Sequence, residues 1–277
     1  MSTRSFVEGL AFINWTVLVG LAVGCFAAVV ALRQRADATR GYLAFSAFLA
    51  ALLGGLALLA EGGLARPPAE LPVPLDPVLD GVRRALLVAF VVLAVVETAA
   101  IARRRGSSLI ELAGVASGAG ALIAAAVGWS GLRPAGVPAA LQFLALAAAD
   151  GGALAALVLG HWYLVTPRLS ERPLVLLARL LLGVIALQAL LGATWLLSGA
   201  NAALPPLAPL GGPAALFVWF RFIVGIALPL VITWAAVQTA RLRSMESATG
   251  LLYIDLALIA SGSILAAGLW FGAGLLL

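Results

Sequence analysis

The sequence predicts an all-α integral membrane protein with eight transmembrane helices. Of its 277 residues, 63% are hydrophobic and only 10% are charged. A soluble chain of this length would expose far more polar surface. The apolar residues gather in long segments, and short arginine-containing turns separate them. About 20 apolar residues in a helix span the roughly 30 Å hydrocarbon layer of a bilayer, and the segments reach that length.

Turn and cap signals delimit the segments in order. The first apolar run is of spanning length and Glu8 precedes it, so it is a poor cleavable signal peptide. Proline-rich loops end the second and sixth segments, and arginine turns end the first, third, fifth and seventh. Ser244 and Glu246 suit the start of the last helix, as an N-cap and a first-turn acid. We therefore expect helices over residues 10–32, 42–64, 82–102, 108–131, 138–165, 173–198, 214–240 and 248–276.

The arginines are distributed unequally between the two sides of the membrane. Ten lie in alternate short turns: Arg33, Arg35, Arg40, Arg103, Arg104, Arg105, Arg168, Arg172, Arg241 and Arg243. Five are expected on the other side: Arg4, Arg66, Arg83, Arg84 and Arg133. Short cytoplasmic loops carry the excess of positive charge. The pattern predicts a multi-pass protein of the cell (inner) membrane with both termini on the non-cytoplasmic side.

The two halves, residues 1–132 and 133–277, have the pattern of a degenerate repeat. Each half has two pairs of helices, a proline-rich outer loop between the pairs and a basic turn within each pair. The third helix ends at Ala102–Arg105 in one half and at Ala240–Arg243 in the other. Because four is an even number of helices, the halves would be parallel repeats related by an axis along the membrane normal. The alternative is that alternating arginine turns are common to helical membrane proteins.

Six ionisable residues within the predicted helices are candidates for a functional site. A charge near the bilayer centre costs on the order of 2.5–3.5 kcal/mol on insertion scales, so such groups are usually paired, hydrated or functional. We expect Arg221 to reach Asp150 or Asp255, and Glu97 to pair with Arg179. Two interpretations stay open: salt bridges that lock the bundle, or a hydrated crevice for a proton, quinone or small solute. The candidate residues are Asp150, His161, Arg221, Asp255, Glu97 and Arg179.

The remaining polar residues near helix ends have simpler interpretations. Glu61 and Glu111 are expected at the membrane interface. His161 precedes Trp162 and Tyr163, which favours an aromatic anchor at the headgroup level, with a proton-exchanging or quinone-bonding histidine as the alternative. A single His and a single Cys exclude bis-histidine haem ligation, an Fe–S cluster and a disulfide within the chain, and make a metal site unexpected.

Function is less closely defined by these observations. Nucleotide-binding and hydrolase motifs are absent, so we expect a protein that is not catalytic on its own. The basic residues lie in turns and do not form a nucleic-acid-binding face. Two four-helix halves are similar in architecture to the quinone-interacting membrane anchors of respiratory oxidoreductases, and to haem-handling membrane enzymes that rely on several histidines, which are missing here.

We expect an integral subunit of a membrane complex, respiratory in the leading interpretation. It would lie in the lipid bilayer, anchor other protein subunits, and interact with protons or quinone as its one candidate cofactor. The alternatives are a small-molecule or ion transporter and a purely structural membrane scaffold.

Overall fold

The chain is a bundle of membrane-spanning helices. The computed structural model describes residues 3–64, 76–130, 136–166, 168–198 and 204–277, with side chains described from residue 9. Within these residues eight helical segments are long and apolar enough to cross a membrane, which confirms the predicted multi-pass all-α fold. Each of the first six segments is a single helix. They are α1 (Thr3–Arg35), α2 (Arg40–Ala60), α3 (Pro77–Ala102), α4 (Ser108–Ser130), α5 (Gly136–Val165) and α6 (Arg172–Ser198).

The seventh span is a continuous helix with a π-helical turn inside it. It consists of α7 (Ala215–Phe222), the π-turn η3 (Ile223–Ala227) and α8 (Leu228–Arg241), and it is followed by the last span, α9 (Met245–Ala273). Short 3₁₀ turns, η1 (Glu61–Gly63) and η2 (Ala208–Leu210), follow α2 and precede α7.

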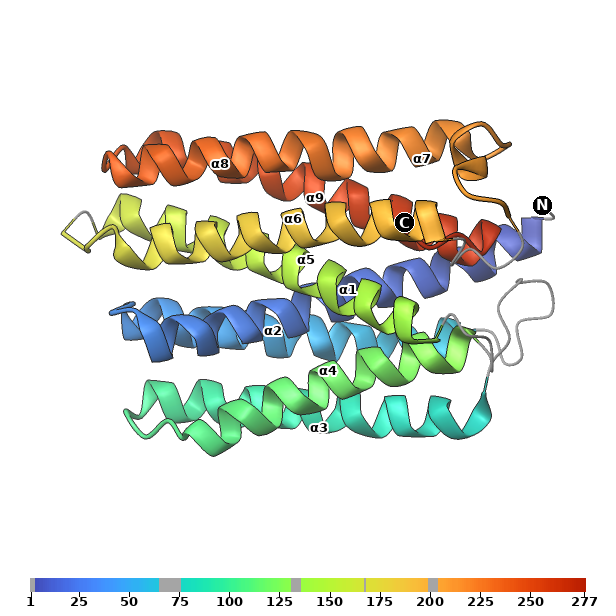
Figure 1. Cartoon of the computed structure of the whole chain (residues 1–277). Coiled ribbons are helices and arrows are strands. Elements are labelled where there is room, and N and C mark those ends of the chain that lie inside the picture. Colours follow the sequence, from blue (N-terminus) through green and yellow to red (C-terminus); the bar gives the residue numbers. More distant parts are fainter. Residues whose placement is uncertain (1–2, 65–75, 131–135, 167, 199–203) are drawn as a thin grey trace.

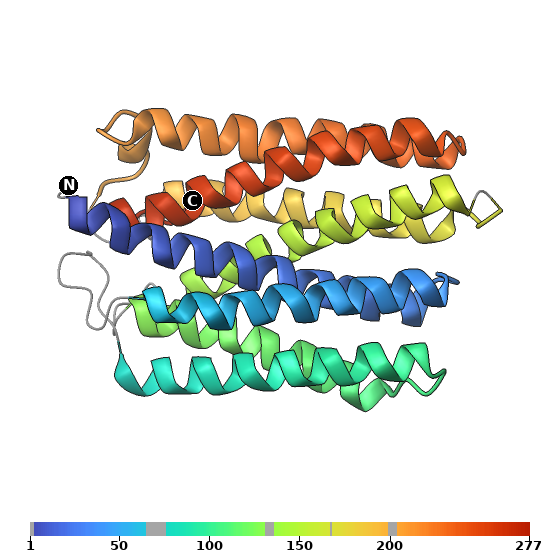
Figure 2. The same cartoon turned by 180° about the vertical axis from the view of Figure 1, so that it is seen from behind.

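Both termini lie at one end of the bundle. The turns that join α1 to α2, α3 to α4, α5 to α6 and α8 to α9 all lie at the opposite end (Figure 1), and the view from behind agrees (Figure 2). These are the turns that carry the ten arginines. The described structure thus groups them on one side, and which side faces the cytoplasm stays a prediction.

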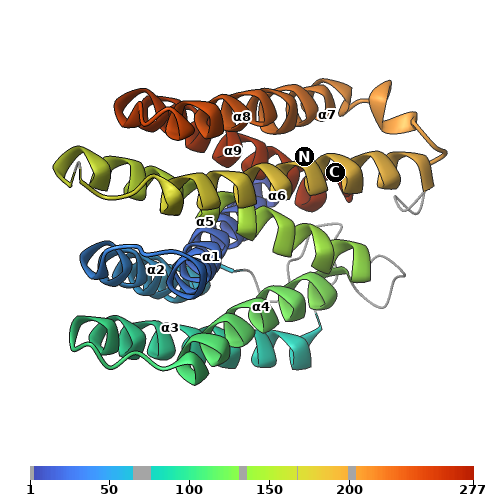
Figure 3. The same ribbon diagram turned by 60° about the vertical axis from the view of Figure 1, so that its left-hand side comes forward.

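Helices α1 and α5 cross at the centre of the molecule (Figure 3). Their backbones touch, because a Cβ at Gly24 would overlap the carbonyl oxygen of Ala147, and a Cβ at Gly151 would overlap the main chain at Cys25. Small residues at helix contacts let membrane helices approach this closely. Each crossing helix also reaches the other half: α1 packs on α9, and α5 packs on α4. These two contacts correspond to each other if α1 matches α5 and α4 matches α9, and the division into repeats itself stays a prediction.

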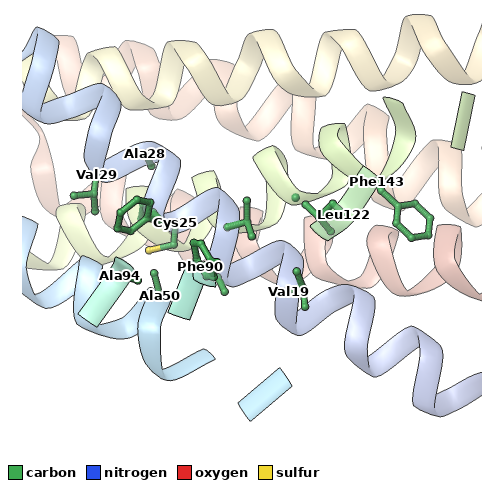
Figure 4. Close-up of a cluster of buried hydrophobic side chains, with 14 of the residues drawn as sticks. Val19, Cys25, Ala28, Val29, Ala50, Phe90, Ala94, Leu122 and Phe143 are labelled. Atoms are coloured by element: carbon green, nitrogen blue, oxygen red, sulfur yellow. The ribbon is translucent and has the colours of Figure 1, made fainter. Parts of the chain in front are cut away.

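The interior of the N-terminal half is apolar and closely packed. Figure 4 shows Val19, Cys25 and Val29 of α1 beside Ala50 of α2 and Phe90 of α3. These side chains are buried, and the ring of Phe90 fills the space that glycines leave on α2 and α4. Association of helices in lipid depends on such packing, because apolar side chains gain little by leaving apolar lipid. The core of this half is therefore largely apolar, with Ser46 and Thr16 as small buried polar side chains.

Helix α3 begins earlier than the sequence predicted, at Pro77 instead of residue 82. Asp76 is its N-cap: one carboxylate oxygen accepts the N–H groups of Val78 and Leu79 at 2.9 and 3.1 Å. Proline suits the first helical position because its missing N–H would have no partner there. The earlier start places Arg83 more than one turn inside the helix, instead of in its first turn as predicted.

Candidate functional site

Arg83 is a fully buried, fully paired charge. Its Nη1 lies 2.6 Å from Glu61 Oε1 and its Nη2 lies 2.7 Å from Asp80 Oδ1. The guanidinium also lies over the rings of Trp15 and Trp129, 4.7 and 5.6 Å from their centroids. Glu61 directly follows α2 and its side chain is buried against Arg83, while its expected position at the membrane interface stays a prediction. The group ties α2, α3 and the aromatic core together.

Glu97 pairs with Arg33 of α1, so the predicted pair with Arg179 is wrong. Arg33 Nη1 contacts Glu97 Oε1 and lies 2.5 Å from Glu111 Oε1. Gly106 has no side chain, and the Arg33 guanidinium occupies the space where one would stand. Glu111, in the first turn of α4, is buried in this ion pair, and its expected position at the membrane interface stays a prediction. The cluster joins α1, α3 and α4 at the end of the bundle that holds the arginine turns.

The structure does not bring Arg179 or His161 to the buried polar groups. Both side chains are exposed on the surface of the bundle. The long stem of Arg179 can lie along α6 while its head reaches toward the interface. Near His161, the Trp162 ring packs against Gly41 of α2, and the Tyr163 hydroxyl donates to the carbonyl of Ser170 at 2.5 Å. The segment packs as an aromatic end to α5, which leaves a role for His161 untested.

Asp150 lies at the junction of α1, α5 and α9, where it is 1% exposed. The hydroxyl of Ser263 donates to Asp150 Oδ1 at 2.7 Å. The other oxygen, Oδ2, faces Gly20 of α1, and a Cβ there would lie 3.5 Å from it. Within the described residues, no cationic side chain is in ion-pair contact with Asp150. It is a buried carboxyl with a single hydroxyl partner.

Asp255 is a second carboxyl of the same kind. It is 0% exposed, and the Thr233 hydroxyl of α8 donates to its Oδ2 at 2.5 Å. Its Oδ1 has no hydrogen-bond partner in the described part of the chain. No cation contacts it there either. The expected ion pair of Arg221 with Asp150 or Asp255 is therefore not formed.

Arg221 is held instead by an amide side chain and by main-chain oxygens. Nη2 donates to Gln188 Oε1 at 2.6 Å, Nη1 to the carbonyl of Gly225 at 3.2 Å, and Nε to the main-chain oxygen of Leu277 at 3.3 Å. Pro229 explains the second bond: it has no N–H to give to the carbonyl four residues earlier, and Arg221 takes that place. The π-turn η3 adjoins this position, and such turns are frequent at functional sites.

An apolar layer separates the two unpaired carboxyls. Asp255, Ile259 and Ser263 follow one another at four-residue spacing on α9, which places the two carboxyl sites about 12 Å apart along the helix. Ile259 is buried there with Leu181 and Ile226. Asp150 and Asp255 are thus two separate polar positions in the C-terminal half, each on its own side of an apolar barrier.

The hydroxyl and amide partners are the functional residues that sequence reasoning missed: Ser263, Thr233, Gln188 and Gln142. Each lies inside an apolar helix. The signal was present, because Ser263 follows Asp255 at the spacing of one helix face. Neutral polar residues are common in membrane helices, so this spacing alone did not distinguish them.

The comparisons with known proteins give no family. No protein-family model, no curated protein and no solved structure matches the chain. Across the described residues, no group of three or more His, Cys, Asp and Glu side chains could hold a metal ion. The side chains of the site offer two carboxyls that can take up and release protons, and a guanidinium with amide neighbours that can donate hydrogen bonds.

Proposed function

We propose that the chain is a proton-handling integral membrane subunit in which Asp150 and Asp255 carry the proton. The observation that supports this most is the state of these two carboxyls: buried, each with one hydroxyl donor, and without a cation in contact. An isolated carboxylate in such a place is costly, whereas a carboxyl that binds a proton is tolerated. Intramembrane acids of this kind are typical of proton relays.

The contrast between the two halves supports the same assignment. The buried acids of the N-terminal half, Glu61, Glu97 and Glu111, all contact arginines. Their ion pairs hold neighbouring helices together, which is here called a locking role. The buried acids of the C-terminal half, Asp150 and Asp255, accept hydrogen bonds from hydroxyls and contact no cation among the described residues, so a locking role does not account for them. Proton passage past Ile259 would need water to enter the apolar layer between them.

In the setting expected from the sequence, the chain would be a subunit of a respiratory complex and would exchange these protons with a quinone. That setting stays a prediction, because it depends on partners and a ligand that the chain alone does not reveal. A second candidate, a proton-coupled transporter, is favoured by the π-turn and Pro229. They weaken the seventh span beside Arg221, where a helix could bend during a transport cycle.

Proton transfer can be measured directly in proteoliposomes. The purified chain is reconstituted around a pH-sensitive dye, and a potassium diffusion potential drives protons inward. We expect Asp150→Asn and Asp255→Asn each to lower the flux at least about tenfold, because an amide cannot carry the proton. Ile259→Ser, which admits water to the apolar layer, should raise it. Glu246→Gln is the matched control, since this acid is exposed on the same helix as Asp255.

Unchanged flux in both aspartate variants would refute the proposal. If Glu246→Gln lowered the flux as much as Asp255→Asn, the effect would be one of surface charge. Flux that appears only after a co-purified partner is added would favour the complex over the transporter.

A further inference from the structure

Helices α3 and α8, which end the third span of each half, are capped in the same way. After α3, the N–H of Arg105 donates to the carbonyl of Ala100 at 2.8 Å. After α8, the N–H of Ser244 donates to the carbonyl of Thr239 at 3.1 Å. This is the Schellman motif, in which the residue before the donor takes a left-handed conformation and is usually glycine. The two turns are therefore equivalent in their backbone.

In both turns the left-handed position is occupied by arginine. The φ angle is 61° at Arg104 and 58° at Arg243. Residues with a Cβ are disfavoured in this conformation because the Cβ approaches the following carbonyl oxygen, whereas glycine adopts it freely. An arginine at this position strains the backbone, so we expect its side chain to make a contact that glycine could not make.

Arg243 makes such a contact inside the chain. Its Nη1 lies 3.2 Å from Glu171 Oε2, and its Nη2 donates to the carbonyl of Leu169 at 3.3 Å. The side chain of Arg104 is exposed, and it forms no hydrogen bond or ion pair with the residues that the structure describes. The same position therefore has an acidic partner in the C-terminal half and lacks one in the N-terminal half.

The acids nearest to the turn after α3 are already paired. Glu97 and Glu111 are buried, and both contact Arg33. The residues on either side of Arg104 are also arginines, and their side chains are exposed as well. The turn thus presents three positive side chains, and the anion that pairs with them has to come from outside the described part of the chain.

We propose that the turn of Arg103, Arg104 and Arg105, called the α3–α4 turn, binds the phosphate of an anionic phospholipid. Arginine binds phosphate oxygens through parallel N–H groups. The turn directly follows the end of a spanning helix, which places its side chains at the level of the lipid head groups. Clusters of basic residues at this level attract anionic lipids.

The helix surfaces next to the turn fit the acyl chains of such a lipid. Val95 and Val96 of α3 are exposed, and so are Leu109 and Leu112 of α4. These two helices pack against each other at one edge of the bundle (Figures 1 and 2). An acidic soluble protein would meet only the arginines, so the apolar faces beside them favour a lipid. The inference does not depend on proton transfer.

Native mass spectrometry of the full chain in detergent, titrated with phosphatidylglycerol or phosphatidylcholine, tests the proposal. We expect the first phosphatidylglycerol to bind more tightly than phosphatidylcholine. Arg104→Gly should lower its affinity about fivefold, the effect of one arginine near an anionic lipid. The same variant should unfold at the same temperature or a higher one, because glycine fits the left-handed position. Arg243→Gly, in the equivalent turn, and Arg172→Gln, at an exposed arginine of the same end, are the matched controls and should bind phosphatidylglycerol normally.

Loss of lipid affinity without loss of stability separates a side chain that binds lipid from one that holds the turn. The proposal is overturned if phosphatidylglycerol has no advantage over phosphatidylcholine, if Arg104→Gly binds it as the unchanged protein does, or if Arg172→Gln lowers the affinity equally. A lower unfolding temperature of Arg104→Gly would also overturn it, because the side chain would then serve the fold. Displacement of the lipid by hexaglutamate would assign the turn to an acidic protein partner instead, and displacement by millimolar inorganic phosphate would assign it to a free anion.

Discussion

Replacing Arg83 with methionine is expected to destabilise the protein by about 3–5 kcal/mol, because it leaves the buried Glu61 carboxylate without its buried cation. Glu61 is 3% exposed and would keep only the exposed Arg84, whose Nε lies 3.2 Å from Glu61 Oε2. The stacking of the guanidinium on Trp15 and Trp129 is lost as well. The free energy of unfolding in detergent, measured by denaturant titration, gives the size of the effect.

Arg84→Met is the matched control, since Arg84 belongs to the same cluster but its side chain is 57% exposed. An exposed ion pair contributes about 0–1 kcal/mol, so this variant should differ little from the unchanged protein. Equal stability of the Arg83 and Arg84 variants would show that the buried pair does not lock the N-terminal half.

Replacing Gly24 with alanine is expected to separate α1 from α5 and to cost about 3 kcal/mol or more. A Cβ at this position would overlap the carbonyl oxygen of Ala147 and lie 2.8 Å from its carbonyl carbon. These are backbone atoms, so no rotamer change of a side chain can relieve the overlap. Because the crossing joins the two halves, the measurement is the thermal unfolding midpoint together with resistance to proteolysis.

Gly183→Ala provides the comparison. Nothing lies within 4 Å of a Cβ at Gly183 in α6, and alanine is favoured over glycine inside a helix by roughly 0.5–1 kcal/mol. This variant should be as stable as the unchanged protein or slightly more stable. A Gly24 variant that unfolds at the same temperature as the Gly183 variant would contradict the close crossing.

The eight spans could be predicted because the length of each apolar run matches the thickness of a bilayer. Burial of Asp150, Arg221 and Asp255 followed from the same depth estimate and is confirmed. The start of α3 was missed although Asp76 and Pro77 form a recognisable cap. The burial of Arg83 was missed because arginine near a helix end also sets topology, and Arg83 was counted among the arginines of the outer side.

The partners of the buried charged residues were harder to predict than their burial. Arg33 and Arg179 both lie near the arginine-turn end, at depths from which either could reach Glu97. The choice depends on which helix packs next to α3, and helical periodicity does not give the neighbours of a helix. The partners of Asp150 and Asp255 were missed for a different reason. Ser263 and Thr233 are neutral, whereas only side chains of opposite charge were predicted as partners.

The central claim is that acids of the N-terminal half lock helices together, whereas Asp150 and Asp255 do not. The most direct test is the thermal unfolding midpoint of four single variants in one detergent: Glu61→Gln, Glu97→Gln, Asp150→Asn and Asp255→Asn. The first two should lower the midpoint, because each removes a carboxylate from a buried ion pair, at a cost of up to about 3–5 kcal/mol. The last two should leave it unchanged or raise it, since the amide oxygen still accepts the hydroxyl of Ser263 or Thr233. Loss of stability in the Asp150 and Asp255 variants as large as in the Glu61 variant would contradict the claim.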